Sequence, residues 1–363
     1  MTIYAYVAAY DNDALTIFDI SDPANPTHVG AITGAGSPNY LDGPINVYVS
    51  GDYAYVTSYI DDALTIFDIS DPANPTHVGA ITGAGSPNYL DGASGVYVSG
   101  DYAYVASYHD PALTIFDISD PTNPIHVGAY ISSDYLYCCA RRTVYVSGDY
   151  AYVAGCDSAA FTIFDVTDPS NPTLLGAIVD WDYLDNVKGV NVSGNYAYMV
   201  SSYNYGTFLI YDISDPTNPI RVSAISGHGS PYYLYNPSDA HVVGDYAYVT
   251  TRLDDALTIF DISDPANPTH VGAITGAGSP NYLDGARGVY VSGDYAYVAS
   301  GVDDALTIFD ISDPANPTHV GVITGAGSPN YLDGAESVFI AEKIKAKIGG
   351  ISLEPALGSM GII

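Results

Sequence analysis

A sixteen-residue phrase, LTIFDISDPANPTHVG, begins at Leu15 and recurs with small changes almost to the end of the 363-residue chain. The aspartate of its Asp-Pro step marks seven copies, at Asp22, Asp71, Asp120, Asp168, Asp215, Asp264 and Asp313. Neighbouring copies are therefore 47 to 49 residues apart. Seven units of this length predict one repeat architecture, because a single unit cannot bury its apolar face without a neighbour.

Each unit contains four short runs that are typical of β-strands. In the second unit these are residues 47–50, 53–58, 64–69 and 77–81, which we call strands A, B, C and D. They are rich in Val, Ile, Tyr, Phe and Thr, and turn residues close each of them. Pro and Gly recur too often within a unit for a helical period. Four strands in each of seven units predict an all-β fold, a seven-bladed β-propeller of four-stranded blades around a central channel.

The two ends of the chain are out of phase with this repeat. Residues 3–7 match strand B, so the first blade lacks its own strand A, and residues 337–340 match strand A after the seventh strand D. We predict that this C-terminal strand completes the first blade and closes the ring, which removes two unpaired sheet edges. The propeller then spans residues 1–341, and residues 342–363 form a C-terminal tail.

The core LTIFDISDPANP and the preceding VYVSGDYAYVAS resemble the LVIVD-repeat β-propellers of bacteria and archaea, over roughly residues 3–341. Leu-Thr-Ile-Phe-Asp stands where the family has Leu-Val-Ile-Val-Asp, so two of the five positions differ while the alternation is kept. The resemblance implies a propeller, often in an exported or surface-exposed protein. It implies no shared catalytic residues.

The chain is strongly acidic, with 41 Asp and Glu against 9 Lys and Arg and a formal net charge of −32. This balance disfavours nucleic acid and anionic membrane as partners, because phosphate binding needs clustered Lys and Arg. Most acids are turn aspartates, which we interpret as turn chemistry that also gives solubility. The alternative interpretation is Ca²⁺ binding by recurrent aspartate pairs such as Asp61-Asp62, Asp254-Asp255 and Asp303-Asp304.

The sequence contains no apolar run long enough to span a membrane, and no signal peptide is visible.

Three cysteines are too few for a disulfide framework. Cys138 and Cys139 are adjacent, and Cys156 ends strand B of the next blade. One disulfide with a spare thiol and three buried thiols are both compatible with this spacing, so the redox compartment stays open.

Divergence along the repeat is confined to blades three to five. A second class of difference, found around the whole ring, is the residue two before the first core residue of strand A: Ile45, Ser94, Arg142, Lys188, Ser238, Arg287 and Glu336. We predict that these seven residues ring one mouth of the channel. The loops from strand D to the next strand A (D–A loops) and from strand B to strand C (B–C loops) open on that face.

The basic residues of the body gather in the same loops. The candidate ligand-binding residues are Arg141, Arg142, Lys188, Arg252, Arg287 and Glu336, and Arg221 is the one body cation elsewhere. One interpretation is weak surface ion pairs between these cations and neighbouring carboxylates. The other is an anion site in which arginine holds a carboxylate or phosphate with paired donors.

Signs of enzyme chemistry are few. The sequence has no Gly-x-Ser-x-Gly elbow, phosphate-binding loop or His-Glu-x-x-His motif. His241 replaces the tyrosine of strand A and is predicted to approach the channel.

A Tyr-Leu step recurs in every D–A loop, and we interpret its tyrosine as packing between blades. These tyrosines are Tyr40, Tyr89, Tyr135, Tyr183, Tyr233, Tyr282 and Tyr331.

We therefore predict a non-enzymatic extracellular or cell-surface propeller with a structural or binding role, whose partners are copies of itself, surface proteins or glycans. The alternative is an enzyme or lectin-like domain acting on an anionic ligand at the channel mouth, since propellers host both. No catalytic residue and no cofactor other than Ca²⁺ is indicated.

The tail contains a segment in which charged and apolar residues alternate, as in a half-buried strand: Lys343, Ile344, Lys345, Lys347 and Ile348. Its lysines complement the acidic body. We predict that this segment adds to the next molecule and makes a homo-oligomer. The alternative is that the tail packs on its own propeller, because tethered contacts have a high effective concentration.

Overall fold

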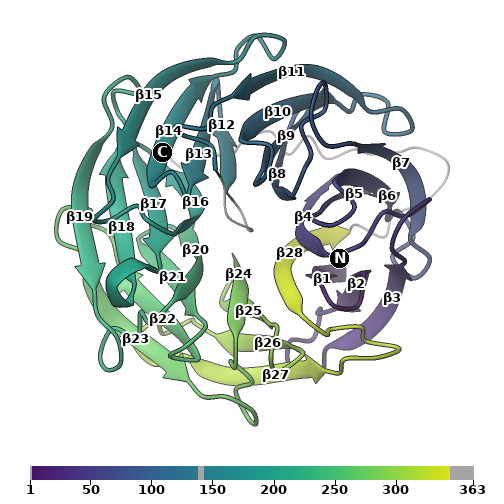
Figure 1. Cartoon of the computed structure of the whole chain (residues 1–363). Helices are drawn as coiled ribbons and strands as arrows, with labels where there is room; N and C mark the ends of the chain where they lie inside the picture. Colours follow the sequence, from purple (N-terminus) through teal and green to yellow (C-terminus); the bar gives the residue numbers. More distant parts are fainter. Residues whose placement is uncertain (1, 138–142, 344–363) are drawn as a thin grey trace, which may run out of the picture.

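The computed structural model describes residues 2–137 and 143–343, and it confirms the seven-bladed propeller. Figure 1 shows seven sheets in a ring around a central channel, viewed along the channel axis. Each sheet has four strands, and consecutive strands of the blade are neighbours in the sheet. Strand A lies nearest the channel and strand D forms the outer rim (Figure 1).

Blade 1 contains β28 (Ala335–Lys343), β1 (Thr2–Ala9), β2 (Ala14–Asp19) and β3 (Thr27–Thr33). Blade 2 contains β4 (Pro44–Ser50), β5 (Tyr53–Ser58), β6 (Ala63–Asp68) and β7 (Thr76–Thr82). Blade 3 contains β8 (Ala93–Ser99), β9 (Tyr102–Ser107), β10 (Ala112–Asp117) and β11 (Ile125–Ile131). Blade 4 contains β12 (Val144–Ser147), β13 (Tyr150–Gly155), β14 (Ala160–Asp165) and β15 (Thr173–Val179).

Blade 5 contains β16 (Val187–Ser193), β17 (Tyr196–Ser201), β18 (Thr207–Asp212) and β19 (Ile220–Ser226), with a short 3-10 turn, Tyr203–Tyr205, in its B–C loop. Blade 6 contains β20 (Pro237–Val243), β21 (Tyr246–Thr251), β22 (Ala256–Asp261) and β23 (Thr269–Thr275). Blade 7 contains β24 (Ala286–Ser292), β25 (Tyr295–Ser300), β26 (Ala305–Asp310) and β27 (Thr318–Thr324).

The C-terminal strand closes the ring as predicted. β28 pairs antiparallel with β1, with Phe339 opposite Tyr6 and Ile340 opposite Ala5. The strand continues to Lys343, two residues past the predicted end of the propeller at residue 341. The Lys343 ammonium contacts the A–B turn of blade 2, where it donates to the Gly51 carbonyl at 2.7 Å and to Asp52 Oδ1 at 2.8 Å.

The apolar core lies between blades. Strands B and C are the central strands of each sheet, and most of their residues are buried on both faces, as in β5 and β6. Leu64 and Ile66 of β6 pack with Val96 and Phe116 of the next blade in one cluster. Such interfaces join every pair of neighbouring blades, so one repeat unit alone would leave its apolar face exposed.

The Asp-Pro turn and the glycine of the Thr-His-Val-Gly phrase fit together across the blade boundary. A Cβ atom at Gly79 would collide with the carbonyl oxygen of Pro121 in the next blade. Six blades share this arrangement, at Gly30, Gly79, Gly128, Gly176, Gly272 and Gly321. In these six blades a side chain would push the neighbouring turn away. Blade 5 has Ser223 at the equivalent position.

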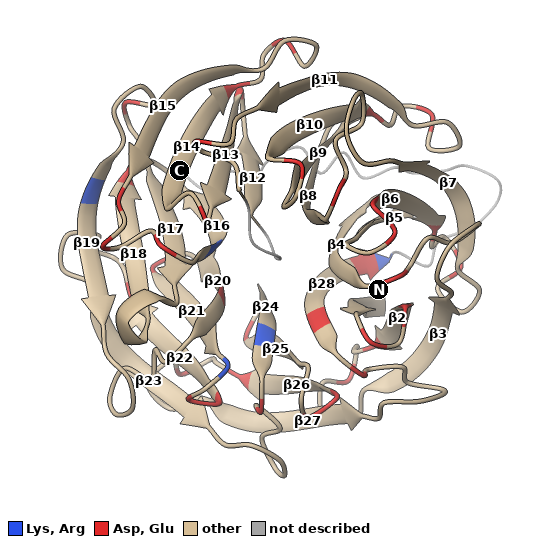
Figure 2. Ribbon diagram, in the orientation of Figure 1, with Lys and Arg blue, Asp and Glu red and all other residues tan. Residues whose placement is uncertain are grey.

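Charged side chains follow the turns of the repeat. Figure 2 shows acidic residues around the whole ring and few basic ones. In the C–D turn the carboxylate of Asp22 accepts from the amide of Ala24 at 3.1 Å and from Asn25 Nδ2 at 2.9 Å. These aspartates therefore stabilise the turn itself. Within the described residues, no helix is long and apolar enough to cross a membrane.

Candidate binding site: the central channel and one loop face

The B–C and D–A loops lie on the same face of the propeller, which we call the loop face. The aspartate pairs that suggested Ca²⁺ connect these loops. Asp61 Oδ2 accepts from the amides of Gly36 and Asp42 at 2.9 and 2.8 Å, both in the preceding D–A loop. Asp62 Oδ1 accepts from the amide of Gly92 in the following D–A loop at 3.0 Å. Each pair thus links two successive loops around the ring.

The same use of aspartate recurs in blades 3, 6 and 7. In each of these blades one aspartate, the first of the pair or its equivalent, accepts hydrogen bonds from two backbone amides of the preceding D–A loop. These aspartates are Asp110, Asp254 and Asp303. Within residues 2–137 and 143–343 the structure shows no group of three or more His, Cys, Asp or Glu side chains placed to hold a metal ion. The Ca²⁺ interpretation stays a prediction that this geometry does not support.

Of the six candidate ligand-binding residues, four lie in the described part of the chain. Lys188 on β16 donates to Asn236 Oδ1 at 2.9 Å. Arg287 on β24 forms an ion pair with Glu336 on β28, and the two side chains are only 13% and 7% exposed. Arg252 is half-buried in the loop after β21. The other two candidates, Arg141 and Arg142, lie outside the described residues.

The variable positions before strand A do not form an open ring where the structure describes them. Of the six that are described, Ile45, Ser94, Ser238 and Glu336 are buried. The reason is a β-bulge at this position, for example where β4 pairs with β5 and Ile45 is skipped. A bulge re-aims the extra side chain and breaks the alternation that strand A otherwise follows. Burial of these four side chains differs from the open ring that was predicted at the channel mouth.

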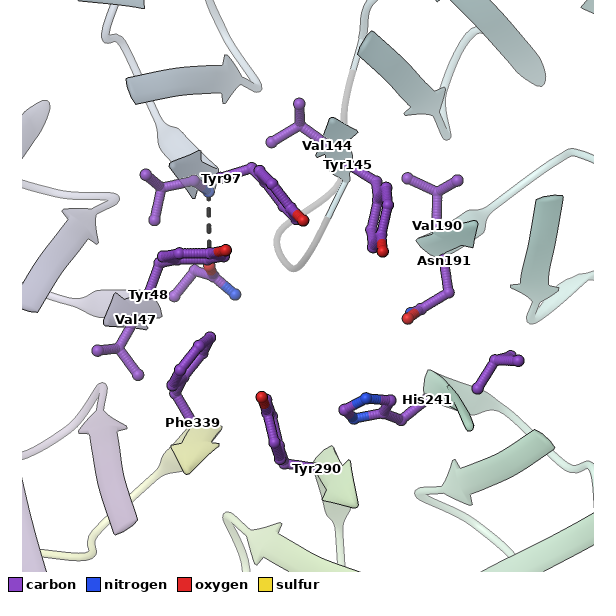
Figure 3. A pocket seen from close by; sticks show the side chains of 13 residues that line it. Val47, Tyr48, Tyr97, Val144, Tyr145, Val190, Asn191, His241, Tyr290 and Phe339 are labelled. Carbon is purple, nitrogen blue, oxygen red and sulfur yellow. Dashed lines mark hydrogen bonds between the residues drawn. The ribbon is translucent and has the colours of Figure 1, made fainter. Parts of the chain in front are cut away.

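The channel itself is lined by a different position of strand A, the tyrosine of the Val-Tyr-Val phrase. In blade order these residues are Phe339, Tyr48, Tyr97, Tyr145, Asn191, His241 and Tyr290, and Figure 3 shows them around the channel. They surround a cavity of about 170 Å³. The expectation that His241 approaches the channel is confirmed, and the other six lining residues were not singled out from the sequence.

Six of these seven lining residues carry rings, and the rings form a continuous arc. The ring centroids of Tyr145 and Tyr97, and of Tyr97 and Tyr48, are 4.8 Å apart. Phe339 continues the arc at 4.9 Å from Tyr48, and Tyr290 follows at 4.9 Å from Phe339. The arc ends with His241, whose ring is 4.5 Å from that of Tyr290. Asn191 occupies the gap in the arc.

Two polar side chains of this layer have defined orientations. His241 Nδ1 accepts from the Val291 amide at 3.1 Å, so a neutral imidazole carries its hydrogen on Nε2. Asn191 Nδ2 donates to the Ala240 carbonyl, which leaves its Oδ1 toward the channel (Figure 3). Burial raises the pKa of Tyr48 to about 12 and raises that of Tyr97 as well. These phenols therefore keep their hydrogen at neutral pH.

Exposed apolar side chains concentrate on the loop face. Among the described residues, nine of the fourteen large apolar side chains that are exposed lie in B–C or D–A loops: Ile60, Tyr137, Trp181, Tyr203, Tyr205, Tyr232, Tyr235, Leu253 and Val302. Two tyrosine–histidine clusters lie on this face. The Tyr59 hydroxyl hydrogen-bonds to His109 Nε2 at 2.9 Å. The ring centroids of Tyr205 and His228 are 5.1 Å apart.

The Tyr-Leu step of the D–A loops contributes to the packing between blades, where Tyr135 and Tyr183 lie against the apolar clusters. The leucine is the fully buried residue in every blade, as at Leu41 and Leu332, whereas each tyrosine is only half-buried. Five of these tyrosines, including Tyr40 and Tyr89, have a positive φ.

Cys156 is disulfide-bonded. The other two cysteines, Cys138 and Cys139, lie outside the described residues.

Comparison with known proteins assigns the repeat. The family model described as the LVIVD repeat matches seven segments, residues 3–33, 45–82, 92–132, 140–180, 186–225, 236–275 and 285–324. No curated protein is significantly similar in sequence.

Solved structures show the same fold at low sequence identity. A Lactobacillus plantarum protein has a TM-score of 0.76 at 14% identity, over 94% of this chain and 100% of its own. The periplasmic gluconolactonase of Pseudomonas aeruginosa has a TM-score of 0.74 at 11% identity, over 94% and 99%. A functionally unknown protein from Desulfotomaculum acetoxidans has a TM-score of 0.68 at 14% identity, over 93% and 98%. Such identities establish the fold alone.

Proposed function

Because this chain belongs to the LVIVD-repeat family of β-propellers, we propose that it is a non-enzymatic binding propeller, outside the cell or on its surface, that holds another protein against its loop face. The observation that supports this proposal most is the unequal distribution of exposed apolar side chains. The loop face carries nine of the fourteen among the described residues. Exposed apolar groups gathered on one face of a soluble protein are typical of an interaction site.

The chemistry of the loop face fits a protein partner. Trp181 and Tyr205 are 58% and 62% exposed, and aromatic residues of these types are enriched at protein–protein interfaces. The loops also carry aspartates, among them Asp91 and Asp157, around these apolar groups. A partner is therefore expected to have a basic rim around an apolar centre, since complementary charge steers association.

The turns of the opposite face are uniform and rich in polar residues. Its A–B turns repeat Ser-Gly-Asp and its C–D turns repeat Ser-Asp-Pro with few changes. The loop face carries most of the differences between copies, in the B–C and D–A loops of blades 3 to 5. Variation that the fold does not require is expected where a partner is recognised.

A pair of triple variants tests this proposal. The first changes three exposed residues of the loop face, Trp181→Ser, Tyr205→Ser and Leu253→Ser. The second makes the same kind of change away from these loops, at Ile125→Ser, Ile220→Ser and Val243→Ser, which are also exposed. We expect the wild type and the second variant to capture the same protein from the cell exterior, and the first variant to lose it. Equal capture by both variants would refute the proposal.

Self-assembly is a second candidate, supported by where β28 ends. Lys343 binds the A–B turn at Gly51 and Asp52, on the face opposite the loop face. A segment that continues from Lys343 therefore starts at one end of the molecule, while the apolar loop face lies at the other. A head-to-tail contact requires two different binding surfaces at opposite ends of the molecule. It builds an open filament unless the rotation between successive molecules closes them into a ring. The remaining assembly residues, Ile344, Lys345, Lys347 and Ile348, lie outside the described residues.

Sedimentation tests self-assembly directly. Full-length protein is expected to sediment as an oligomer, and a chain ending at Lys343 as a folded monomer. A full-length protein that stays monomeric at high concentration would refute this candidate.

An anionic ligand at the channel mouth is less well supported by the geometry. Arg287 is paired with Glu336, and Lys188 donates to Asn236, so at least two of the three described candidate cations have partners within the protein. The alternative of an enzyme or lectin-like domain stays a prediction. It is tested by screening carboxylate and phosphate ligands and by assaying lactone hydrolysis.

A further inference from the structure

The channel cavity lies inside the ring, and its lining residues are separate from the exposed residues of the loop face. Its volume of about 170 Å³ is below the range of about 300 to 1,000 Å³ that is usual for drug-sized ligands. The cavity therefore suits a small molecule.

The aromatic rings of the channel present their edges to the cavity. Neighbouring centroids are 4.8 to 4.9 Å apart along the arc from Tyr145 to Tyr290 and the ring planes are tilted by 50° to 52°, so neighbouring rings partly cover each other's faces. Figure 3 shows the hydroxyl groups of Tyr48, Tyr97 and Tyr145 directed toward the channel centre. A cation held against ring faces is disfavoured by this arrangement, because those faces are partly covered. The cavity instead offers phenolic O–H groups.

The polar groups of the cavity include an unsatisfied donor. Asn46 lines the cavity, is 2% exposed, and accepts from the Val96 amide with Oδ1 at 3.4 Å. That bond fixes the orientation of the amide, because only the oxygen accepts from an N–H group. Asn46 Nδ2 has no hydrogen-bond partner. A buried donor without a partner costs about 1–3 kcal/mol, so an acceptor at this point would be stabilising.

Donors and acceptors are both present around the cavity. Asn46 supplies a donor, Asn191 supplies an acceptor through Oδ1, and the phenols supply either. None of the thirteen described lining residues is Lys, Arg, Asp or Glu. A charged ligand would lose its hydration without gaining an opposite charge from these residues. A neutral hydroxyl group, which donates and accepts, matches this set.

We propose that the channel binds one small neutral molecule with several hydroxyl groups, of the size of a single sugar ring or cyclic polyol. Asn46 Nδ2 donates to one of its oxygens, Tyr97 and its neighbours Tyr48 and Tyr145 hydrogen-bond along one edge, and Asn191 accepts at the gap in the aromatic arc. The site is asymmetric, because polar groups other than phenols occur only on some blades.

Calorimetric titration of the full-length protein tests the ligand class. The probes are glucose, galactose and myo-inositol as neutral polyols, gluconate and glucosamine as charged relatives, and choline as a cation that favours aromatic faces. We expect at least one neutral polyol to bind and the charged probes to bind at least about tenfold more weakly, a difference that corresponds to about 1.4 kcal/mol.

Two variants test the residues, and the repeat itself shows that the fold accepts both changes. Tyr97→Phe removes one hydroxyl at a position where β28 already has Phe339. Asn46→Gly removes the unsatisfied donor at a position where three other blades have Gly95, Gly189 and Gly288. Each is expected to weaken polyol binding about fivefold or more, as for the loss of one hydrogen bond.

The matched control is Tyr104→Phe, the same change on β9 of the same blade, at a buried residue outside the cavity. It should bind like the wild type. If Asn46→Gly does not fold, Asn46→Ser replaces it, because Ser337 is the equivalent residue of β28. Preferential binding of gluconate, glucosamine or choline would overturn the ligand class. Polyol binding that neither variant changes, or no binding of any probe, would overturn the site.

Discussion

The guanidinium group of Arg287 lies directly over Gly301, so close that a Cβ atom at Gly301 would be 2.5 Å from Arg287 Cζ. Blades 1 to 3 have tyrosine at the position of Gly301, namely Tyr10, Tyr59 and Tyr108. Blade 7 has glycine instead, which leaves room for the arginine to reach Glu336 of the neighbouring blade. The ion pair between blades 7 and 1 therefore depends on a residue that takes no part in it.

We expect Gly301→Ala to lower the free energy of unfolding by about 1–3 kcal/mol, the usual cost of forcing an extra carbon into a packed site. The added methyl group would displace Arg287 from Glu336. Urea unfolding measures the change. Gly327→Ala is the control, because a Cβ atom at Gly327 meets no atom within 4 Å. Equal stability of the two variants would contradict this account.

The second prediction concerns the aspartates that hold the loops. Asp303 Oδ2 accepts from the amides of Gly278 and Asp284 at 2.9 and 2.8 Å. Asp303→Ala leaves both amides without this partner and should cost about 1–3 kcal/mol of stability, measured as a lower midpoint of thermal unfolding.

Asp303→Asn is the matched control for this site. It keeps an accepting oxygen, as Asn12 does in blade 1, where Oδ1 accepts from the amide of Asp333 at 2.8 Å. It should therefore lose clearly less stability than the alanine variant. The loop-linking role is wrong if the alanine and asparagine variants unfold alike, or if Ca²⁺ raises the midpoint of the wild type but not of the asparagine variant.

The third prediction is a loss of stability in acid. Five histidines of strand D, at His28, His77, His126, His270 and His319, each have a buried Nε2 without a hydrogen-bond partner. Burial lowers their pKa below the value of 6.5 for an unfolded chain. As the pH falls below about 6.5, the unfolded state therefore binds more protons than the folded state does. The contribution of these residues to stability is present above that pH and is lost progressively in acid.

His126→Leu tests this effect, because Leu174 already occupies the equivalent position of blade 4. The free energy of unfolding of the variant should fall less than that of the wild type between pH 7 and pH 5. The difference between the two proteins removes the common effect of the net charge of −32. Parallel pH profiles would show that protonation of His126 does not matter for stability.

The fold followed from the sequence because its determinants are local and repeated. The Asp-Pro turn, the Ser-Gly-Asp turn and the runs of β-forming residues recur seven times, so each copy supports the assignment of the others. Ring closure followed from counting, since residues 337–340 supply the strand that blade 1 lacks. The Thr-His-Val-Gly glycine was visible as part of the repeat, but its contact with the next Asp-Pro turn was not.

The candidate site was predicted in part. The choice of the B–C and D–A loops as the variable face agrees with the distribution of exposed side chains. The bulge before strand A, at positions such as Ile45 and Arg287, could not be predicted, because it depends on pairing with strand B. The channel tyrosines were missed, since a residue present in most copies looks like part of the fold.

By itself, the sequence determined the number of blades, the order of strands and the closure of the ring, because strand propensity and turn chemistry act over a few residues and were repeated seven times. Only the tertiary structure decided what the repeated side chains do. Tyr97 lines a channel because seven A strands converge on one axis, and Asp61 links loops because neighbouring blades bring their amides to it. Both depend on contacts between residues far apart in the chain, and such contacts exist only after the ring has closed.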